Sequence, residues 1–188
     1  RMLGYLSRHA RVHGAVVTDV TSASAVLGVF GPHSRDLLSR VSPEDWSDSA
    51  HRYFGGRRVE IADVFAYALR VSFTGELGYE LYCETDTAMN VFDALVDAGD
   101  DLDLATVGYF ALDSLRLEKG YRHLRHDIGP VDNPLASGLG FAVALDKAAD
   151  FTGRRALADL EAERSASRVL HVCLEDPDVR LWGEESIY

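Results

Sequence analysis

Two neighbouring stretches decide the fold: VEIADVFAYALRVSF (residues 59–73) and YELYCE (residues 79–84). In the first, large apolar residues mostly alternate with small or polar ones, which predicts one long, half-buried strand. The second alternates strictly, so successive side chains point to opposite faces of a sheet. One face carries Tyr79, Leu81 and Cys83, and the other carries Glu80, Tyr82 and Glu84. Gly75 and Gly78 lie between the stretches and permit a tight turn.

Shorter patterns on both sides of this region mix strands with helices. Val-rich runs predict strands, and apolar residues spaced three and four apart predict helices. The predicted strands are 16–20, 25–30, 141–145 and one through Leu170, Val172 and Leu174. The predicted helices are 2–10, a short one after Ser34 that carries Leu37, Leu38 and Val41, 88–98, 107–119 and 153–163. Because no strict strand-helix-strand period is present, the chain is predicted to be α+β, with mixed, largely antiparallel sheets and packed helices.

Length and composition narrow the class of protein. The chain has 188 residues, 47% hydrophobic and 26% charged, with a formal net charge of −11. These values fit one ordinary globular domain with at most a small second one, and they exclude a disordered or collagen-like chain. The acidic balance argues against a nucleic-acid partner. No apolar run approaches 18 residues, so no membrane partner is expected.

The two ends and the two cysteines give further expectations. No N-cap residue precedes the helix that begins at Met2, which predicts that the chain is a fragment of a longer polypeptide. Cys83 and Cys173 lie in separate alternating segments and are predicted to be buried, reduced thiols. A cytoplasmic location is therefore the default expectation.

Local basic clusters interrupt the acidic background. One runs from Arg116 to His126 and another from Arg1 to His13. Such clusters form either solvated helix faces or a docking site for a small polyanion, and composition leaves both open. The His123, His126 and Asp127 spacing invites a metal site, but no third and fourth ligand is evident, so no metal is predicted. No catalytic signature is complete, and the catalytic residues stay unknown.

The turn SFTGELGYE (residues 72–80) is the most suggestive local feature. It places Glu76 and Glu80 near two glycines and between aromatic residues. An ionised carboxylate can accept two parallel hydrogen bonds from a ligand that presents adjacent N–H groups. On chemistry alone, a hairpin with solvated carboxylates is the preferred interpretation.

A family resemblance emerges from five segments in a fixed order. They are FGPHSR (30–35), FTGELGYE (73–80), LRLEKGYR (115–122) with Asp127-Ile128, PLASGLGF (134–141), and Asp146-Lys147 through Gly153-Arg154. Together they resemble the folate-binding aminomethyltransferase family, which includes the glycine-cleavage T protein. The GELGYE and EKGYR variants look closest to the C-terminal half of dimethylglycine and sarcosine oxidases and dehydrogenases.

The resemblance implies a site and a cofactor. Glu80 would grip the 2-amino and ring N–H edge of the pterin of tetrahydrofolate, and Phe73 takes the place of a tyrosine near the ligand. Arg116 would supply a cation, joined by Arg122 and Arg125 for the glutamate tail, and Tyr109 is either a ring contact or a core residue. Leu112 and Ala136 stand where the family has arginine and glutamate, and the family's catalytic aspartate would precede Arg1.

The resemblance also implies an activity and a domain plan. The activity is one-carbon (methylene) transfer to tetrahydrofolate from a methylated amine. FAD would belong to a flavoprotein oxidase half absent from this sequence. The implied domains are residues 1–164, an aminomethyltransferase-like folate-binding region, and 165–188, the beginning of a C-terminal β-barrel. Two alternatives remain: a glycine-cleavage T protein, or a folate-binding module that has lost catalysis.

Overall fold

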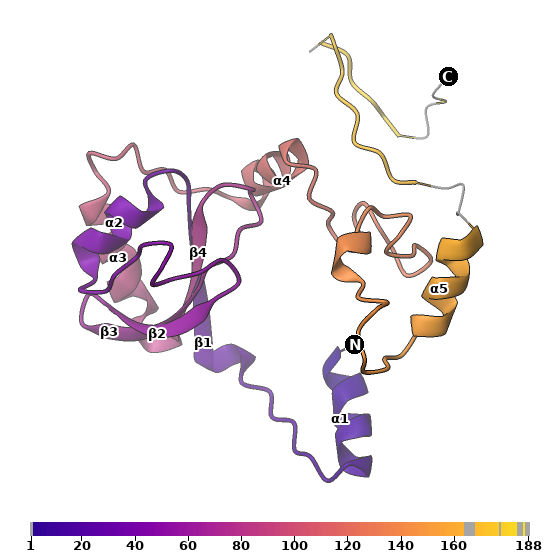
Figure 1. Cartoon of the computed structure of the whole chain (residues 1–188). Coiled ribbons are helices and arrows are strands. Elements are labelled where there is room, and N and C mark those ends of the chain that lie inside the picture. Colours follow the sequence, from indigo (N-terminus) through magenta and orange to yellow (C-terminus); the bar gives the residue numbers. More distant parts are fainter. Residues whose placement is uncertain (1, 164–167, 177, 184–185, 187–188) are drawn as a thin grey trace. The chain divides into compact units, whose positions relative to one another are not determined.

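A computed structural model describes residues 2–163, 168–176, 178–183 and 186 (Figure 1). The chain divides into two compact units, residues 1–119 and residues 120–188. The predicted domain boundary at residues 164 and 165 falls outside the described residues and stays a prediction. All strands of the described chain lie in the first unit, which therefore carries the sheet and the predicted carboxylate.

The first unit is built on a four-stranded antiparallel sheet, which confirms the α+β fold class. Its strands are β1 (Ser24–Phe30), β2 (Gly56–Ile61), β3 (Val64–Leu69) and β4 (Gly78–Glu84), in the spatial order β1-β4-β3-β2. β4 is central, so Glu80 lies opposite Gly28 of β1 and opposite Leu69 of β3. The predicted alternation on β4 is confirmed, because Tyr79, Leu81 and Cys83 are buried.

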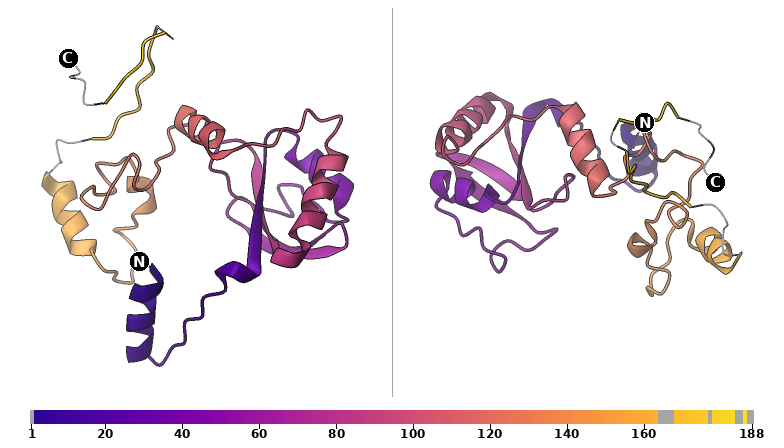
Figure 2. Two further views of the ribbon diagram at one scale, coloured as in Figure 1. Left: turned by 180° about the vertical axis from the view of Figure 1, so that it is seen from behind. Right: turned by 90° about the horizontal axis from the view of Figure 1, so that it is seen from above.

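Helices cover one face of this sheet. α2 (Ser34–Val41) and α3 (Ala88–Ala98) pack on each other, and α3 also contacts β1 (Figures 1 and 2). Both occur where the spacing of apolar residues predicts a helix, and Gly99 follows the last residue of α3 as expected. The core between sheet and helices includes Leu37, Leu38, Trp46, Val59, Ile61, Leu81, Val91 and Leu95. These contacts bury one face of β4, and the other face stays half-exposed.

The long strand predicted over residues 59–73 is wrong. The chain reverses at Ala62 and Asp63, whose φ angles are +48° and +63°, and β2 pairs with β3 from Gly56↔Leu69 to Ile61↔Val64. The alternation of residue types continues through the turn, so the pattern alone hides it. Neither residue is glycine or asparagine, the usual signals for a two-residue hairpin with positive φ.

Two further predicted strands are wrong. Residues 16–20 form no strand, and Val16, at 89% exposure, has no core to cover. Residues 140–142 form the 3₁₀ helix η3 (Gly140–Ala142), and Val143 to Leu145 continue as irregular chain. Strand propensity alone is insufficient in both places, because a strand also needs a neighbour for its backbone N–H and C=O groups.

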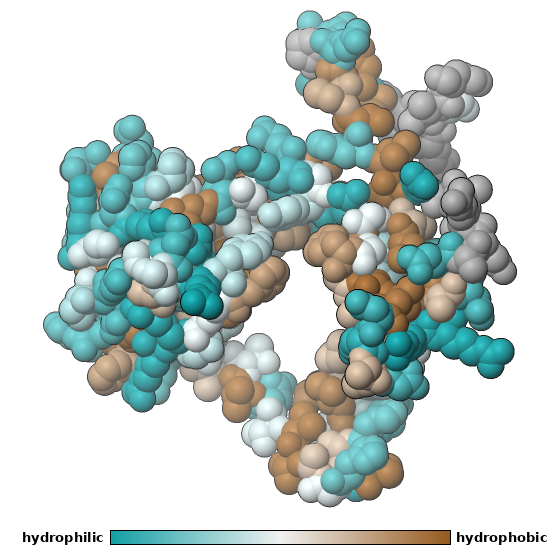
Figure 3. All heavy atoms as spheres, viewed as in Figure 1, coloured by the Kyte–Doolittle hydropathy of each residue, from teal (hydrophilic) through white to brown (hydrophobic). Residues whose placement is uncertain are grey.

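Three other helices occupy their predicted regions. They are α1 (Met2–Val12), α4 (Tyr109–Glu118) and α5 (Arg154–Glu163), and two short 3₁₀ helices, η1 (Thr21–Ala23) and η2 (Thr85–Thr87), precede β1 and α3. α1 buries none of its residues, and apolar side chains gather on its surface (Figure 3). On α4, apolar spacing is not matched by burial, since Phe110 is 96% exposed.

The second unit holds η3, α5 and irregular chain. No strand forms in the described residues 168–176, so the predicted strand through Leu170, Val172 and Leu174 is absent there. The expected barrel start also includes Glu184, which lies outside the described residues. The barrel therefore stays a prediction.

Cys173 is exposed, which corrects the expectation of a buried thiol, while Cys83 is buried as predicted. Both cysteines are free thiols.

Candidate functional site

Glu80 lies on the sheet face opposite the helices, and its carboxylate is held by a neighbour. The Tyr82 hydroxyl donates a hydrogen bond of 2.5 Å to Glu80 Oε2. Both side chains are half-buried. The hydrogen bond to Glu80, reinforced by burial, raises the pKa of Tyr82. The phenol therefore stays a neutral donor at neutral pH, and the carboxylate is its acceptor.

Glycines on the neighbouring strand make room beside Glu80. Gly28 lies directly opposite and has no side chain, and the Phe30 ring extends back over it. A Cβ added to Gly28 would lie 2.5 Å from Phe30 Cε2, and one added to Gly78 would also meet that ring. Cross-strand neighbours lie about 5 Å apart, so a flat aromatic ring borders the carboxylate on the β1 side.

The loop from residue 70 to residue 77 leads into β4 and contains Phe73, which is half-buried. Gly75 has φ +76°, and a Cβ there would lie 2.7 Å from Lys119 Cβ. Lys119 Nζ is 3.2 Å from Glu76 Oε1. The loop therefore packs against the residue that ends α4, and Glu76 is engaged in an ion pair.

Arg116 and Tyr109 occupy opposite ends of α4. Arg116 is only 1% exposed, and its Nη2 lies 2.6 Å from Asp113 Oδ1. Its guanidinium is thus a buried, paired cation and no part of a solvated surface. Tyr109, at 84% exposure, is not a core residue, so the core alternative for this side chain is wrong.

The remaining cations of the predicted tail-binding cluster lie in the second unit. Arg122 is half-buried and donates to the carbonyl oxygens of Ser137, at 3.0 Å, and of Gly120. Arg125 is exposed, with φ +74°. Arg122 thus organises its own loop, while Arg125 presents its charge to solvent.

The histidine cluster shows no arrangement suited to a metal. His123 and His126 stack with ring centroids 5.7 Å apart, and Asp127 Oδ2 accepts a hydrogen bond from the His123 backbone N–H. Within the described ranges, no group of three or more His, Cys, Asp or Glu side chains is placed to hold a metal ion.

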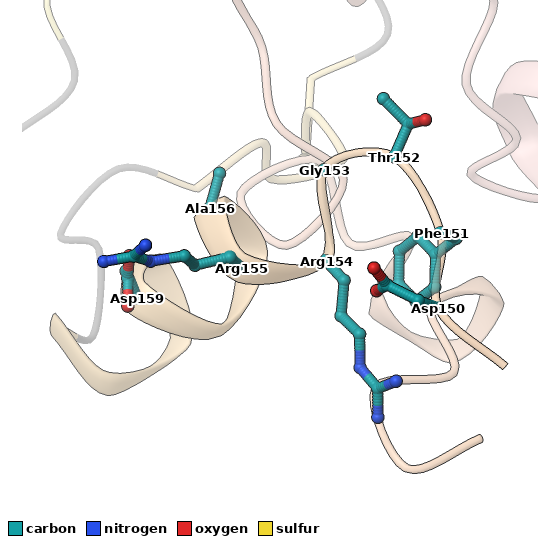
Figure 4. A pocket seen from close by; sticks show the side chains of 8 residues that line it. All are labelled: Asp150, Phe151, Thr152, Gly153, Arg154, Arg155, Ala156 and Asp159. Carbon is teal, nitrogen blue, oxygen red and sulfur yellow. The ribbon is translucent and has the colours of Figure 1, made fainter. Parts of the chain in front are cut away.

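A shallow hollow lies at the start of α5 (Figure 4). Residues 150–156 and Asp159 line it, and Arg154 and Arg155 leave the helix in different directions. Arg154 donates to the Leu145 carbonyl at 2.5 Å. None of these residues belongs to the predicted site, and the hollow is formed by one continuous segment.

The sequence matches the model of a known protein family. The family model described as "GCVT N-terminal domain" matches residues 1–147. The chain belongs to this family. That finding confirms the resemblance drawn from the five sequence segments, four of which lie wholly inside the matched range. The described residues contain no helix that is long and apolar enough to span a membrane.

Relatives of this GCVT N-terminal domain include demethylating oxidoreductases and aminomethyltransferases. The chain is 57% identical over 184 residues to a 4-methylaminobutanoate oxidase (formaldehyde-forming) of Paenarthrobacter nicotinovorans, covering 98% of this chain and 22% of that protein. It is 34% identical to mitochondrial dimethylglycine dehydrogenase of Rattus norvegicus, covering 92% and 20%. An aminomethyltransferase of Halothermothrix orenii is 41% identical, covering 78% and 41%.

These relatives are longer proteins. The chain spans about a fifth of the oxidase and of the dehydrogenase. A heterotetrameric sarcosine oxidase from Corynebacterium superposes with a TM-score of 0.49 at 20% identity, over 57% of this chain and 53% of that one. At that level the superposition adds nothing about function.

Sequence reasoning missed two neighbours of Glu80. Tyr82 was placed on the same face of β4 by the alternation, but nothing in the pattern indicated that its hydroxyl reaches the carboxylate. Phe30 belongs to a predicted strand and to the FGPHSR segment, but neither indicates that it lies beside Glu80, because that position depends on the β1–β4 register. The alternation was an available signal for Tyr82, whereas no local signal existed for Phe30.

Proposed function

We propose that this GCVT N-terminal domain binds tetrahydrofolate and serves one-carbon transfer in a larger amine-demethylating flavoprotein. The observation that carries the proposal is the half-buried Glu80 carboxylate, fixed by Tyr82 and bordered by the Phe30 ring. This carboxylate also lies in the segment whose sequence resembles the family's pterin-binding turn.

The residues around Glu80 fit a pterin. The 2-amino group and the adjacent ring N–H of a pterin form a flat pair of donors, and a carboxylate is a pure acceptor that can take both. Phe30 offers a flat apolar neighbour of the kind that borders planar ligands. Tetrahydrofolate, once bound, supplies the N5 nucleophile that accepts the one-carbon unit as 5,10-methylenetetrahydrofolate.

This chain's own contribution is to bind and orient. Glu80 holds the pterin edge, and Phe73 contributes an apolar ring near it. Arg116 supplies a cation to the site and is held by Asp113 of the same helix. Tyr109 remains a proposed ring contact. The catalytic residues are unassigned, because the family's aspartate would precede Arg1. Holding reactants in one geometry and away from water is the advantage that such a pocket provides.

The whole protein's chemistry is proposed from its relatives. The 98% coverage of this chain by the 4-methylaminobutanoate oxidase favours a demethylating oxidase over a stand-alone glycine-cleavage T protein. The one-carbon unit would then come from a methylated amine oxidised in an FAD-containing oxidase domain. A cytoplasmic location is part of this proposal, although the related dehydrogenases are mitochondrial.

One substitution tests the binding role directly. Glu80→Gln keeps the size of the side chain but removes the charge, and it is expected to weaken tetrahydrofolate binding by about 1–3 kcal/mol. Isothermal titration calorimetry on the 188-residue chain measures the effect. Glu84→Gln is the matched control, because Glu84 lies on the same strand and face but is exposed. Equal affinities for wild type and Glu80→Gln would remove Glu80 from the site.

A second experiment separates an enzyme from a binding module. The full-length protein is assayed with methylated amines, and formaldehyde and methylenetetrahydrofolate are quantified with and without tetrahydrofolate. A transferase diverts the product from formaldehyde to methylenetetrahydrofolate. If folate binds but formaldehyde release is unchanged, the non-catalytic alternative replaces the proposal.

A further inference from the structure

We propose that Tyr82 is a positioning residue for this site: its phenol fixes the Glu80 carboxylate in the orientation that receives the N–H edge of a flat nitrogen heterocycle. The inference rests on the proposed function, since it assigns a task within the same site. It adds a residue that the family segments did not indicate.

Strand geometry brings the two side chains together. Residues two apart on a strand point to the same face and are separated by roughly 7 Å, so a long side chain can reach its neighbour. Tyr82 does so, with its hydroxyl 2.5 Å from Glu80 Oε2. The phenol donates and the carboxylate accepts, which makes this a charge-assisted hydrogen bond.

The central position of β4 keeps Tyr82 itself in place. Tyr82 is paired with Val26 on one side and with Tyr67 on the other. Both neighbouring strands hold the backbone of Tyr82 in register, and its side chain is half-buried. The sheet therefore sets the position from which the phenol reaches Glu80.

The hydrogen bond from Tyr82 leaves acceptor sites on both oxygens of Glu80 for a ligand. A carboxylate has about four lone-pair sites on its two oxygens, and Tyr82 uses one of them on Oε2. Oε1 and the second site on Oε2 remain for two parallel donors. Glutamate otherwise has large rotamer freedom, and a side chain that is ordered before binding loses less entropy when the ligand arrives.

The first measurement compares two phenol-to-phenyl substitutions. Tyr82→Phe keeps the ring and its packing but removes the donor, whereas Tyr67→Phe removes a phenol hydroxyl from the residue directly opposite on β3. Calorimetry of the 188-residue chain uses 5-formyltetrahydrofolate as a stable reduced-folate probe. We expect affinity about tenfold weaker for Tyr82→Phe, as for a hydrogen bond to a charged group, and unchanged affinity for Tyr67→Phe.

A double-mutant cycle shows whether Tyr82 acts through Glu80. Tyr82→Phe is repeated in a Glu80→Ala background, where the carboxylate is gone. A positioning residue then causes no further loss, whereas a merely structural residue weakens binding by the same factor in both backgrounds. An equal loss in both backgrounds would overturn the inference.

A ligand-free measurement tests the contact itself. The ultraviolet titration of the wild type minus that of Tyr82→Phe isolates one phenol, whose pKa is raised by Glu80 and by burial. Glu80→Ala is expected to lower that titration midpoint, and an unchanged midpoint overturns the inference. If the contact is present but the wild type does not bind the probe, the proposed function fails and Tyr82 loses its role with it. If the wild type binds and Tyr82→Phe binds equally well, only the inference fails.

Discussion

The two faces of the sheet in the first unit differ in what they contain. On the face covered by α2 and α3, β4 contributes Tyr79 and Leu81, both fully buried. On the other face, the same strand contributes Glu80 and Tyr82, both half-buried and joined by a hydrogen bond. One strand thus packs into the core on one side and carries the proposed folate-binding carboxylate on the other. Core packing fixes the covered side of β4, and the hydrogen bond from Tyr82 orients the carboxylate on its second side.

The covered face also holds a cluster of three rings that includes a buried histidine, His51. His51 is 2% exposed and stacks on Trp46 with ring centroids 5.6 Å apart, and Tyr79 packs edge-on against both rings. Among the described residues, neither ring nitrogen of His51 has a hydrogen-bond partner. Burial, aided by the positive charge of Arg57, lowers the pKa of His51. His51 is therefore held mainly by ring packing, and its side chain is neutral at neutral pH.

The largest expected effect is a difference in the free energy of unfolding between substitutions on the two faces of the sheet. Leu81→Ala removes a fully buried side chain from the core, and it is expected to lower the free energy of unfolding by about 2–5 kcal/mol. Val26→Ala, at a half-exposed position of β1 on the other face, is expected to cost less than about 1 kcal/mol. Urea denaturation followed by circular dichroism measures both. Similar losses for the two variants would show that both faces of the sheet contribute equally to stability.

An intermediate effect is expected in the loop that leads to Glu80. Gly75→Ala places a Cβ at φ +76° and against the Lys119 side chain, so we expect a loss of about 2 kcal/mol. Gly108→Ala is the matched control, because nothing lies within 4 Å of a Cβ added there. The same denaturation experiment compares the two variants. If Gly75→Ala is as stable as the control, the loop does not depend on its contact with α4.

The smallest effect at neutral pH concerns His51. Since its folded pKa lies below its ordinary value of 6.5, the folded state binds fewer protons than the unfolded state in mild acid. The contribution of the neutral His51 ring to the free energy of unfolding is therefore fully present above pH 6.5. It is lost as the pH falls below that value. His51→Phe, which keeps an aromatic ring without a titrating group, is expected to flatten this dependence between about pH 7 and pH 5. Denaturation midpoints across that range measure it, and identical slopes for both proteins would contradict the assignment.

The lowered pKa of Asp48 places its titration in a different pH window from that of His51. Asp48 accepts hydrogen bonds from Arg35 and Arg70, and these lower its pKa from the ordinary 3.8. A lowered carboxyl pKa gives stability above 3.8 that is lost only as the pH falls further. The loss between pH 7 and pH 5 therefore reports on the buried histidine of the covered face.

The sequence predicted the parts of the fold that local patterns encode. The spacing of apolar residues gave α2, α3 and α5, and strict alternation gave the two faces of β4. The prediction was wrong at Ala62 and Asp63, where the alternating pattern continues through a turn. It was also wrong at residues 16–20, where an apolar run does not form a strand. Turn formation at non-glycine residues and strand pairing both depend on contacts distant in sequence.

For the site, sequence alone predicts a carboxylate at position 80 on the face of β4 opposite the core, within a segment that resembles the family. The neighbours of this carboxylate are known only from the folded chain: Phe30 borders it, the Tyr82 hydroxyl bonds to it, and Arg116 is buried. This division arises because alternation fixes which way a strand residue points. Its neighbours are fixed by register and packing, which arise only when distant segments meet.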